Sequence, residues 1–584
     1  MDEHKHRNTN QEIKSKKFSC VFFIASLLLS VISFHFIFNE FFPNKNQQLG
    51  GDYSYFLPVL LNGYYWIQVN NFFEIPWFSP AFCGGVPFFP NPQVMFYSLP
   101  QVLTLFLDPL KSIYVTYIIF AAIGFTGFYL LLRCVFTTSQ EVAILGAILF
   151  LFNGFYAHRM IIGHLTYHSF MFIPLIAFFL LHYPKRNNND LENKISVILS
   201  GSLIAYMVHS GAANFVVMAL FSVVGIWLIS CIYGNKHPGF IPRFSLMCII
   251  AVCLSATKLA SSLAFLVNYP RDFYPLPGIE GFGSSLLFVI RTLFLQGIWD
   301  ADTSDIVNSK ILFEQHEIEF GVTVIPLIII IVYLLLFSIR LVNTHTRSIL
   351  ELSKPRILAI VSLIFLLLLP VILNTYTPDW NVFLKSLPYI KNNSTLLRWI
   401  AVEIPLVILV SVLLINLIKD QFVRNTLVAL CITGVIYINA VTDRSFYHNQ
   451  QYIPDAIINS YFDVKKNKTL PKINYIGAFI NKDNQYEMGV IGRNDLMTNG
   501  ISQLLCYEPI FGYALEKFNF ENIHIGEIMN EKDGLLNMRN PACYVFGESN
   551  NCRPGENFKI EQKDTVDTFS SYKPFQFQIP LTQK

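Results

Sequence analysis

Eleven long apolar runs constrain the fold of this sequence more than any other feature. A helix needs roughly 20 apolar residues to cross about 30 Å of hydrocarbon, and the runs have about that length. Charged residues make up 14% of the chain, against roughly 25% in soluble proteins. The sequence therefore predicts an α-helical polytopic membrane protein with about eleven transmembrane helices. The runs lie at residues 18–42, 113–133, 140–158, 166–184, 195–211, 213–233, 244–267, 320–341, 356–374, 399–418 and 424–442.

The first run favours a retained helix over a cleaved signal peptide. It covers Phe18–Phe42, whereas the apolar region of a signal peptide has roughly 7–15 residues and ends at a small-residue cleavage site. We therefore expect a cytoplasmic tail at residues 1–17. Lys and Arg in the short loops concentrate on the side of this tail, which predicts that side to be cytoplasmic. An odd number of spans then leaves the C-terminus outside the cytoplasm.

The chain divides into a transmembrane domain at 18–442 and a C-terminal domain at 443–584. The first part carries two long outside loops, at 43–112 and 268–319. From about residue 443 the composition becomes polar and rich in Asn, and the short alternating stretches "YEMGVIGR" and "ACYVFGES" indicate strands. We expect a small extracytoplasmic α/β domain there.

Two cysteines of the C-terminal domain are candidates for a local disulfide. Cys543 and Cys552 flank a Gly/Asn turn in "CYVFGESNNC", on the side predicted to be oxidising. Cys83 and Cys506 would then stay free or pair with each other.

The first outside loop begins with an isolated acid. Asp52 follows two glycines in "LGGDYSYFLP", a few residues beyond the first helix. The segment after it, "YSYFLPVLLNGYYWIQVNNF", has apolar residues at helical spacing, which indicates an amphipathic helix in the membrane interface. The next segment, "WFSPAFCGGVPFFPNPQVMFYSLP", is dense in Pro, Gly and aromatic residues. It cannot cross lipid, because its backbone groups would lack partners there, and we expect a folded lid over the bundle.

These residues carry a resemblance to a known family. A Gly-Asp pair after the first helix, followed by a loop of the form "W-x-P…GG-x-P…NPQ…Y-x-x-P", resembles the YfhO-like branch of the GT-C membrane glycosyltransferases. The segments "FNGFYAHRMIIGHLTYHSFMFIPLIAF", "LSATKLASSLAFLVNYPR" and "LPYIKNNSTLLRW" are similar to later parts of that family. The resemblance covers roughly the first 420 residues, and its first loop is the most specific part.

The resemblance implies an enzyme that moves a sugar from a polyprenyl-phosphate donor to an acceptor outside the cytoplasm. In that family an acid at this loop position is the catalytic base, and Asp52 alone matches it. One carboxylate suffices for an inverting displacement, since it can take the proton of the attacking hydroxyl. Asp is also a favoured N-cap, so capping of the next helix is the alternative. Glu74 and Asp108 are the other acids of the loop; no paired acid adjoins Asp52, which leaves a requirement for a divalent metal open.

A phosphate leaving group calls for cations on the same side of the membrane. Arg is suited to bidentate phosphate contact, and snorkelling to lipid headgroups is the alternative for interfacial cations. Lys258 lies midway along an apolar run, a costly position that indicates a functional or paired role unless the run is misplaced. His164 and His168 stand at a spacing that can hold zinc, but no third ligand accompanies them, which favours headgroup or carbonyl hydrogen bonds. The candidates for donor-phosphate contact are Arg159, His164, Lys258, Arg271 and Arg398.

The first loop also supplies candidates for substrate contact, and the whole pattern leaves other functions open. The loop candidates are Tyr53, Tyr55, Trp77, Asn91 and Gln93.

The net charge of +3 and the lack of a basic cluster argue against nucleic acid as a partner. A flippase or transporter of lipid-linked glycans and a non-catalytic scaffold are the alternative functions, although no internal repeat typical of transporters is present. A bacterial plasma membrane suits the resemblance.

Overall fold

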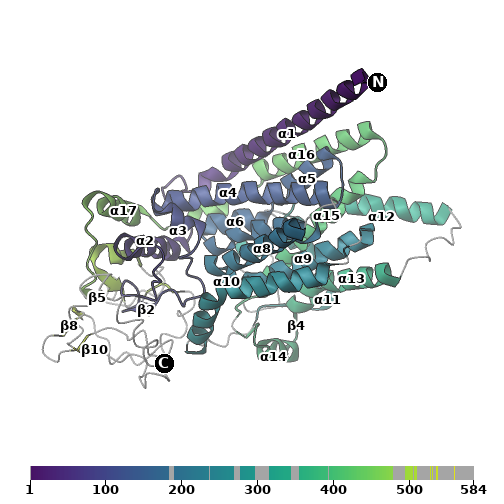
Figure 1. Cartoon of the computed structure of the whole chain (residues 1–584). Helices are drawn as coiled ribbons and strands as arrows, with labels where there is room; N and C mark the ends of the chain where they lie inside the picture. The colour runs from purple at the N-terminus through teal and green to yellow at the C-terminus, as the bar shows by residue number, and fades with distance from the viewer. Residues whose placement is uncertain are drawn as a thin grey trace.

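The structure is a long bundle of helices that carries short strands and loops at one end (Figure 1). It is a computed structural model of the chain. It describes residues 2–182, 190–235, 237, 239–268, 276–295, 315–343, 354–391, 393–477, 494–503, 506–508, 526–527, 529–530, 535–536 and 558–559.

Helices of the described chain account for all eleven apolar runs. Eight helical stretches are long and apolar enough to cross a membrane, and shorter apolar helices lie at Leu165–Leu181, Phe282–Phe294 and Ile325–Ile339. One long stretch, Leu191–Tyr233, contains two of the predicted runs. The prediction of a polytopic helical membrane protein is confirmed to this extent. The main helices of the bundle are α1 Asp2–Phe38, α4 Pro109–Leu130, α5 Gln140–Leu151, α6 Gly154–Ile162, α7 Ile173–Leu181, α8 Asp190–Met207, α9 Ala213–Tyr233, α10 Phe240–Asn268, α11 Phe282–Phe294, α12 Ile325–Asn343, α13 Lys354–Asn374, α14 Pro378–Ser386, α15 Glu403–Asn416 and α16 Gln421–Val441.

Burial separates the helices into a centre and a periphery. The stretch Gln140–Ile162, which holds α5 and α6, is 94% buried over its most apolar window, whereas the corresponding windows of α1 and α16 are about one fifth buried. The outer helices expose large apolar side chains, such as Leu334, Leu335 and Leu336 of α12. A helix that is apolar all round needs protein or lipid on every side. This pattern is the one expected for a bundle surrounded by hydrocarbon.

The helix after Asp52 is present but does not lie in an interface. α2 runs from Tyr53 to Asn70, and nearly all its side chains are buried. It packs against α3 (Leu99–Leu103), α4 and the C-terminal helix α17 (Asp455–Asn467). The expectation of an amphipathic surface helix is therefore wrong: protein covers the polar face as well as the apolar one, because the C-terminal part of the chain folds over it (Figure 1).

The aromatic loop after α2 folds back onto the bundle. Its strands β1 (Phe78–Ser79) and β2 (Val86–Pro87) form an antiparallel pair. It approaches the bundle at Gly211, where φ is +86° and a Cβ would lie 2.6 Å from the carbonyl oxygen of Gln93. Only glycine adopts that backbone conformation freely and leaves room for the loop.

The C-terminal part carries two small sheets in addition to α17. β5 (Tyr475–Gly477) pairs in parallel with β6 (Ile501–Gln503) and antiparallel with β7 (Gly526–Glu527). The second sheet has the order β10-β9-β8, with bounds Phe558–Lys559, Leu535–Leu536 and Met529–Asn530. Cys543, Cys552 and both stretches predicted as strands lie outside the described residues.

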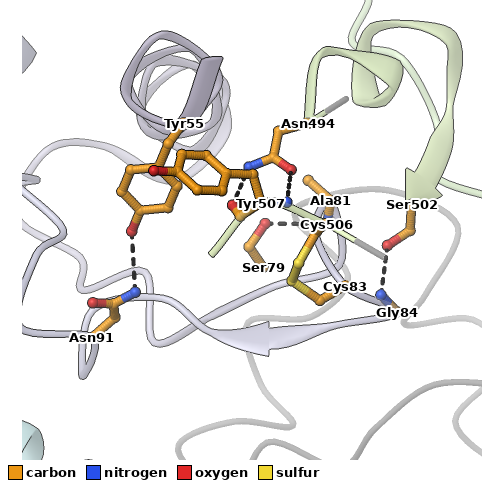
Figure 2. The surroundings of a disulfide bond; sticks show 10 residues. All are labelled: Tyr55, Ser79, Ala81, Cys83, Gly84, Asn91, Asn494, Ser502, Cys506 and Tyr507. Carbon is orange, nitrogen blue, oxygen red and sulfur yellow. Dashed lines mark hydrogen bonds between the residues drawn. A yellow bond between two sulfur atoms is a disulfide. The ribbon is translucent and has the colours of Figure 1, made fainter. Parts of the chain in front are cut away.

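A disulfide joins the aromatic loop to the C-terminal part. Cys83 and Cys506 are bonded, with their Cα atoms 5.0 Å apart. Of the two alternatives left by the sequence, free thiols or a mutual pair, the structure has the pair (Figure 2).

Candidate active site

Two glycines bring Asp52 against the end of α6. A Cβ on Gly50 would lie 2.5 Å from the Cα of Ile162, and one on Gly163 would lie 2.6 Å from the backbone nitrogen of Tyr53. Gly163 also has φ of +93° and ends α6 in the left-handed conformation that glycine adopts without strain. The backbone N–H of Asp52 then donates to the carbonyl of Ile162 at 3.2 Å. The glycines around Asp52 thus let two backbones meet closely.

The carboxylate of Asp52 accepts hydrogen bonds on both oxygens. Nε2 of His164 lies 2.8 Å from Oδ2, and the hydroxyl of Tyr507 lies 2.7 Å from Oδ1. Asp52 occupies the N-cap position of α2, but its side chain makes no capping hydrogen bond. The side chain is 22% exposed. The structure therefore does not support capping as the reason for an acid at this position.

A chain of polar contacts leads from Asp52 to two arginines. Nη1 of Arg159 lies 2.7 Å from Nδ1 of His164, and Nη2 of Arg159 donates to Glu317 at 2.8 Å. Arg398 donates to the same carboxylate through Nε, at 3.1 Å, and through Nη2. Arg398 also donates to the hydroxyl of Tyr167 at 2.8 Å. Two predicted residues of one segment, Arg159 and His164, and a third from far along the chain, Arg398, thus join one network with Asp52.

The contacts determine the tautomer of His164. A guanidinium has only N–H donors, so Nδ1 of His164 accepts from Arg159 and Nε2–H donates to Asp52. Burial lowers the pKa of His164 from its ordinary value, even though Asp52 opposes the shift. A neutral imidazole is consistent with both contacts.

Both carboxylates of the network have lowered pKa values. Burial would raise the pKa of Asp52, but the electrostatic interaction with the His164 ring and the hydrogen bonds from His164 and Tyr507 outweigh burial and lower it. Burial would likewise raise the pKa of Glu317, but Arg159 and Arg398 hold it well below its usual range. An ionised Asp52 is the form that can accept a proton.

The site does not fit a divalent metal as it is arranged. Ligand atoms of His164, His316 and Glu317 all lie within 4.8 Å of one another. However, Glu317 accepts from two arginines and His164 has both ring nitrogens in contacts. A cation placed there would face two guanidinium groups and would have to break these bonds.

Lys258 does not join the network. Its ammonium group is buried and donates to three backbone carbonyls of the aromatic loop, those of Phe89 at 2.6 Å, Asn91 at 2.7 Å and Val94 at 3.1 Å. It also lies 4.8 Å from the ring centroid of Phe89. These contacts use all three donors of the group, which makes Lys258 an anchor for the loop.

Two further predicted residues also lie away from the network or cannot be placed. His168 contacts the carbonyl of Leu165 at 2.6 Å and the hydroxyl of Tyr206 at 2.9 Å. The carbonyl contact is the role that the sequence favoured over zinc. Arg271 lies outside the described residues.

The loop residues predicted to contact substrate make contacts within the protein. Tyr53 is buried and donates to the carbonyl of Met160. The Nδ2 group of Asn91 donates to the hydroxyl of Tyr55 at 3.1 Å (Figure 2). The Asn91 side chain also accepts from the backbone N–H of Gln93. Oε1 of Gln93 is buried without a hydrogen-bond partner among the described residues. The ring of Trp77 lies 5.5 Å from that of Phe89.

Sequence reasoning missed four residues of the network: Tyr167, His316, Glu317 and Tyr507. Glu317 and His316 lie in the one-turn helix Gln315–Glu317 within "FEQHEIEFG", where an acid close to His could have drawn attention. Tyr507 lies far along the chain in the C-terminal part, and nothing in its local sequence marks it. The other two acids of the first outside loop make their described contacts outside the network. The Glu74 side chain contacts Asn71, and Asp108 caps α4.

Comparison with known proteins finds similarity to a solved structure, and no family model matches. No family model matches the chain, and no curated protein matches it. A similar solved structure is the Archaeoglobus fulgidus oligosaccharyltransferase tethered with an acceptor peptide through a disulfide bond, at 14% identity and a TM-score of 0.42. The match covers 83% of this chain and 64% of that one, so the chain spans less than two thirds of that enzyme's length.

Proposed function

We propose that this chain is a membrane glycosyltransferase that moves a sugar from a polyprenyl-phosphate donor to a hydroxyl group of an extracytoplasmic acceptor. The acceptor is a glycolipid, a surface glycan or a protein. The end of the bundle that holds Asp52 faces away from the cytoplasm, and the N-terminus lies in the cytoplasm. A bacterial plasma membrane is the proposed location.

The observation that carries this proposal is the chain of contacts that links the Asp52 carboxylate to two arginines. The carboxylate contacts His164, which contacts Arg159, and Glu317 holds Arg159 and Arg398 together. A transfer from a lipid phosphate needs a base for the acceptor proton and cations for the departing phosphate. Both kinds of group are present in one network, at an end of a bundle of apolar helices.

In the proposed reaction one bond forms as another breaks. The acceptor oxygen attacks the anomeric carbon and gives its proton to Asp52, while the bond from that carbon to the phosphate oxygen breaks. The electron pair of that bond stays with the polyprenyl phosphate, whose charge Arg398 and Arg159 stabilise. A single displacement of this kind inverts the anomeric centre. The reaction needs no second carboxylate at the anomeric carbon.

The test compares envelope glycans and glycolipids by mass spectrometry. Cells lacking the chain are complemented with wild type, with Asp52→Asn or with Glu74→Gln, which removes another acid of the same loop. We expect a hexose to be missing in null cells and restored by wild type and Glu74→Gln, but not by Asp52→Asn. Full restoration by Asp52→Asn would contradict catalysis by this residue and would favour a flippase or a scaffold.

A further inference from the structure

Among its described residues, the C-terminal part contacts the candidate base through the side chain of Tyr507. The hydroxyl of Tyr507 donates to Oδ1 of Asp52 at 2.7 Å, although the two residues are 455 positions apart. His164, which contacts the other oxygen, belongs to the helical bundle. The two donors to the Asp52 carboxylate thus come from different parts of the chain.

Several contacts hold Tyr507 in place. Asn494 donates to the Tyr507 carbonyl at 2.7 Å and accepts from its N–H at 3.0 Å. The neighbouring Cys506 is bonded to Cys83 of the aromatic loop. The ring of Tyr507 lies 6.2 Å from that of Tyr55, edge to face. Figure 2 shows the two hydrogen bonds between Asn494 and Tyr507, the disulfide, and the rings of Tyr55 and Tyr507.

The segment before Tyr507 is attached to the same loop. Oγ of Ser502 accepts from the N–H of Gly84 at 3.0 Å, and Gln503 forms a parallel bridge with Phe82. A second attachment lies on the other side of Asp52, where Leu49 and Tyr452 form an antiparallel bridge. The C-terminal part is therefore attached to the chain on both sides of Asp52.

We propose that Tyr507 is a positioning residue for the transfer reaction, and that its hydroxyl and the His164 ring together fix the plane of the Asp52 carboxylate. The C-terminal part then completes the active site instead of only covering it. This inference rests on the proposed function. A carboxylate held by one donor can rotate about its terminal bond, whereas two donors on opposite oxygens fix its direction.

The two donors leave room for an acceptor. An ionised carboxylate offers about four lone-pair sites, and side chains of the described residues occupy two of them. Asp52 also keeps 22% of its side-chain surface exposed. An acceptor hydroxyl can therefore approach the carboxylate while Tyr507 and His164 stay bound.

The test measures transfer by the purified full-length chain in lipid nanodiscs. The donors are radiolabelled polyprenyl-phosphate glucose, mannose and galactose, and the acceptor is lipid extract from null cells. We expect Tyr507→Phe to lower kcat roughly tenfold or more, since small displacements of a catalytic group are costly, and to leave the donor KM unchanged. If Tyr507 only stabilised the fold, its replacement would not lower kcat while leaving the donor KM unchanged.

Tyr65→Phe is the matched control. The hydroxyl of Tyr65 contacts Ser460 at 2.6 Å and so also joins α2 to the C-terminal part, but from further along the helix. We expect this variant to keep the wild-type kcat. Thermal unfolding of both variants shows whether they remain folded to the same degree.

A double-mutant comparison tests the role of the disulfide. The double replacement Cys83→Ser and Cys506→Ser should lower kcat in the wild-type background. It should have little further effect in the Tyr507→Phe background, because the disulfide acts through the position of Tyr507. An unchanged or raised kcat in Tyr507→Phe would overturn the inference. A raised kcat would show that Tyr507 blocks Asp52. Additive effects would also overturn it. Wild-type rates in Asp52→Asn would instead overturn the proposed function.

Discussion

Nε2 of His164 lies 2.8 Å from Oδ2 of Asp52, and the same imidazole contacts Arg159 through Nδ1 at 2.7 Å. His164 is thus the link between the candidate base and the cations proposed to bind phosphate. Its two nitrogens have opposite roles, one as a donor and one as an acceptor.

Replacing His164 tests this link. His164→Ala removes the donor to Asp52 and the acceptor for Arg159, and we expect a roughly tenfold to hundredfold lower transfer rate. His164→Gln keeps an amide donor and a carbonyl acceptor on one side chain, and should recover part of the loss. The measurement is the initial rate of hexose transfer in membrane vesicles. Equal rates in the two variants would show that the hydrogen bonds of His164 do not matter.

Gly163 tests the close approach of α6 and the Asp52 segment. Gly163→Ala places a Cβ 2.6 Å from the backbone nitrogen of Tyr53 at a φ of +93°. We expect a loss of about 1–3 kcal/mol in the free energy of unfolding, together with reduced transfer. Gly283→Ala is the control, because a Cβ there meets nothing within 4 Å. Thermal unfolding in detergent compares the two, and similar midpoints would contradict the role given to Gly163.

Replacing Lys258 distinguishes an anchoring role for this residue from a role in phosphate binding. Lys258→Met removes a charged donor from three buried carbonyls, and we expect a loss of about 2–4 kcal/mol in stability. The donor KM should stay near the wild-type value. Arg398→Gln should show the reverse, a raised donor KM with a smaller change in stability. A large rise in donor KM for Lys258→Met would return this residue to the phosphate site.

The transfer rate should depend on pH through two groups whose pKa values are lowered. Burial lowers the pKa of His164 below its ordinary value of 6.5, and the contacts with His164 and Tyr507 lower that of Asp52. In the active form Asp52 is a carboxylate and His164 is neutral. The transfer rate should therefore stay constant near neutral pH and fall only at pH values below the ordinary pKa of histidine.

The same two groups give stability the same sign of pH dependence. Because both pKa values are lower in the folded state, the unfolded state binds more protons, and stability is lost as pH falls. A pH profile of the initial rate checks the prediction. An acid limb at or above pH 6.5 would contradict a neutral, buried His164.

Hydrophobic patterning predicted the helices but not their surroundings. Run length is a local property, so each predicted span coincides with apolar helix in the structure. The environment of α2 could not be predicted in the same way, because α17, which covers it, lies almost 400 positions further along the chain. A helix buried by a distant segment has the same sequence pattern as one lying on a membrane.

The site was predictable only in part for the same reason. The family resemblance singled out Asp52, and the expected phosphate leaving group then drew attention to Arg159, His164 and Arg398, which the structure brings into one network with it. Glu317, which joins the two arginines, and Tyr507, which contacts Asp52, become neighbours of these residues only through the folded chain. The disulfide between Cys83 and Cys506, with a sequence separation of 423, depends on the same long-range contact.

The most direct measurement is the rate of hexose transfer by purified Asp52→Asn with saturating polyprenyl-phosphate hexose. Asparagine has nearly the shape of aspartate but cannot act as the base. We expect a rate lower by roughly 10²- to 10⁴-fold, with donor binding retained. A rate within a few-fold of wild type would contradict it.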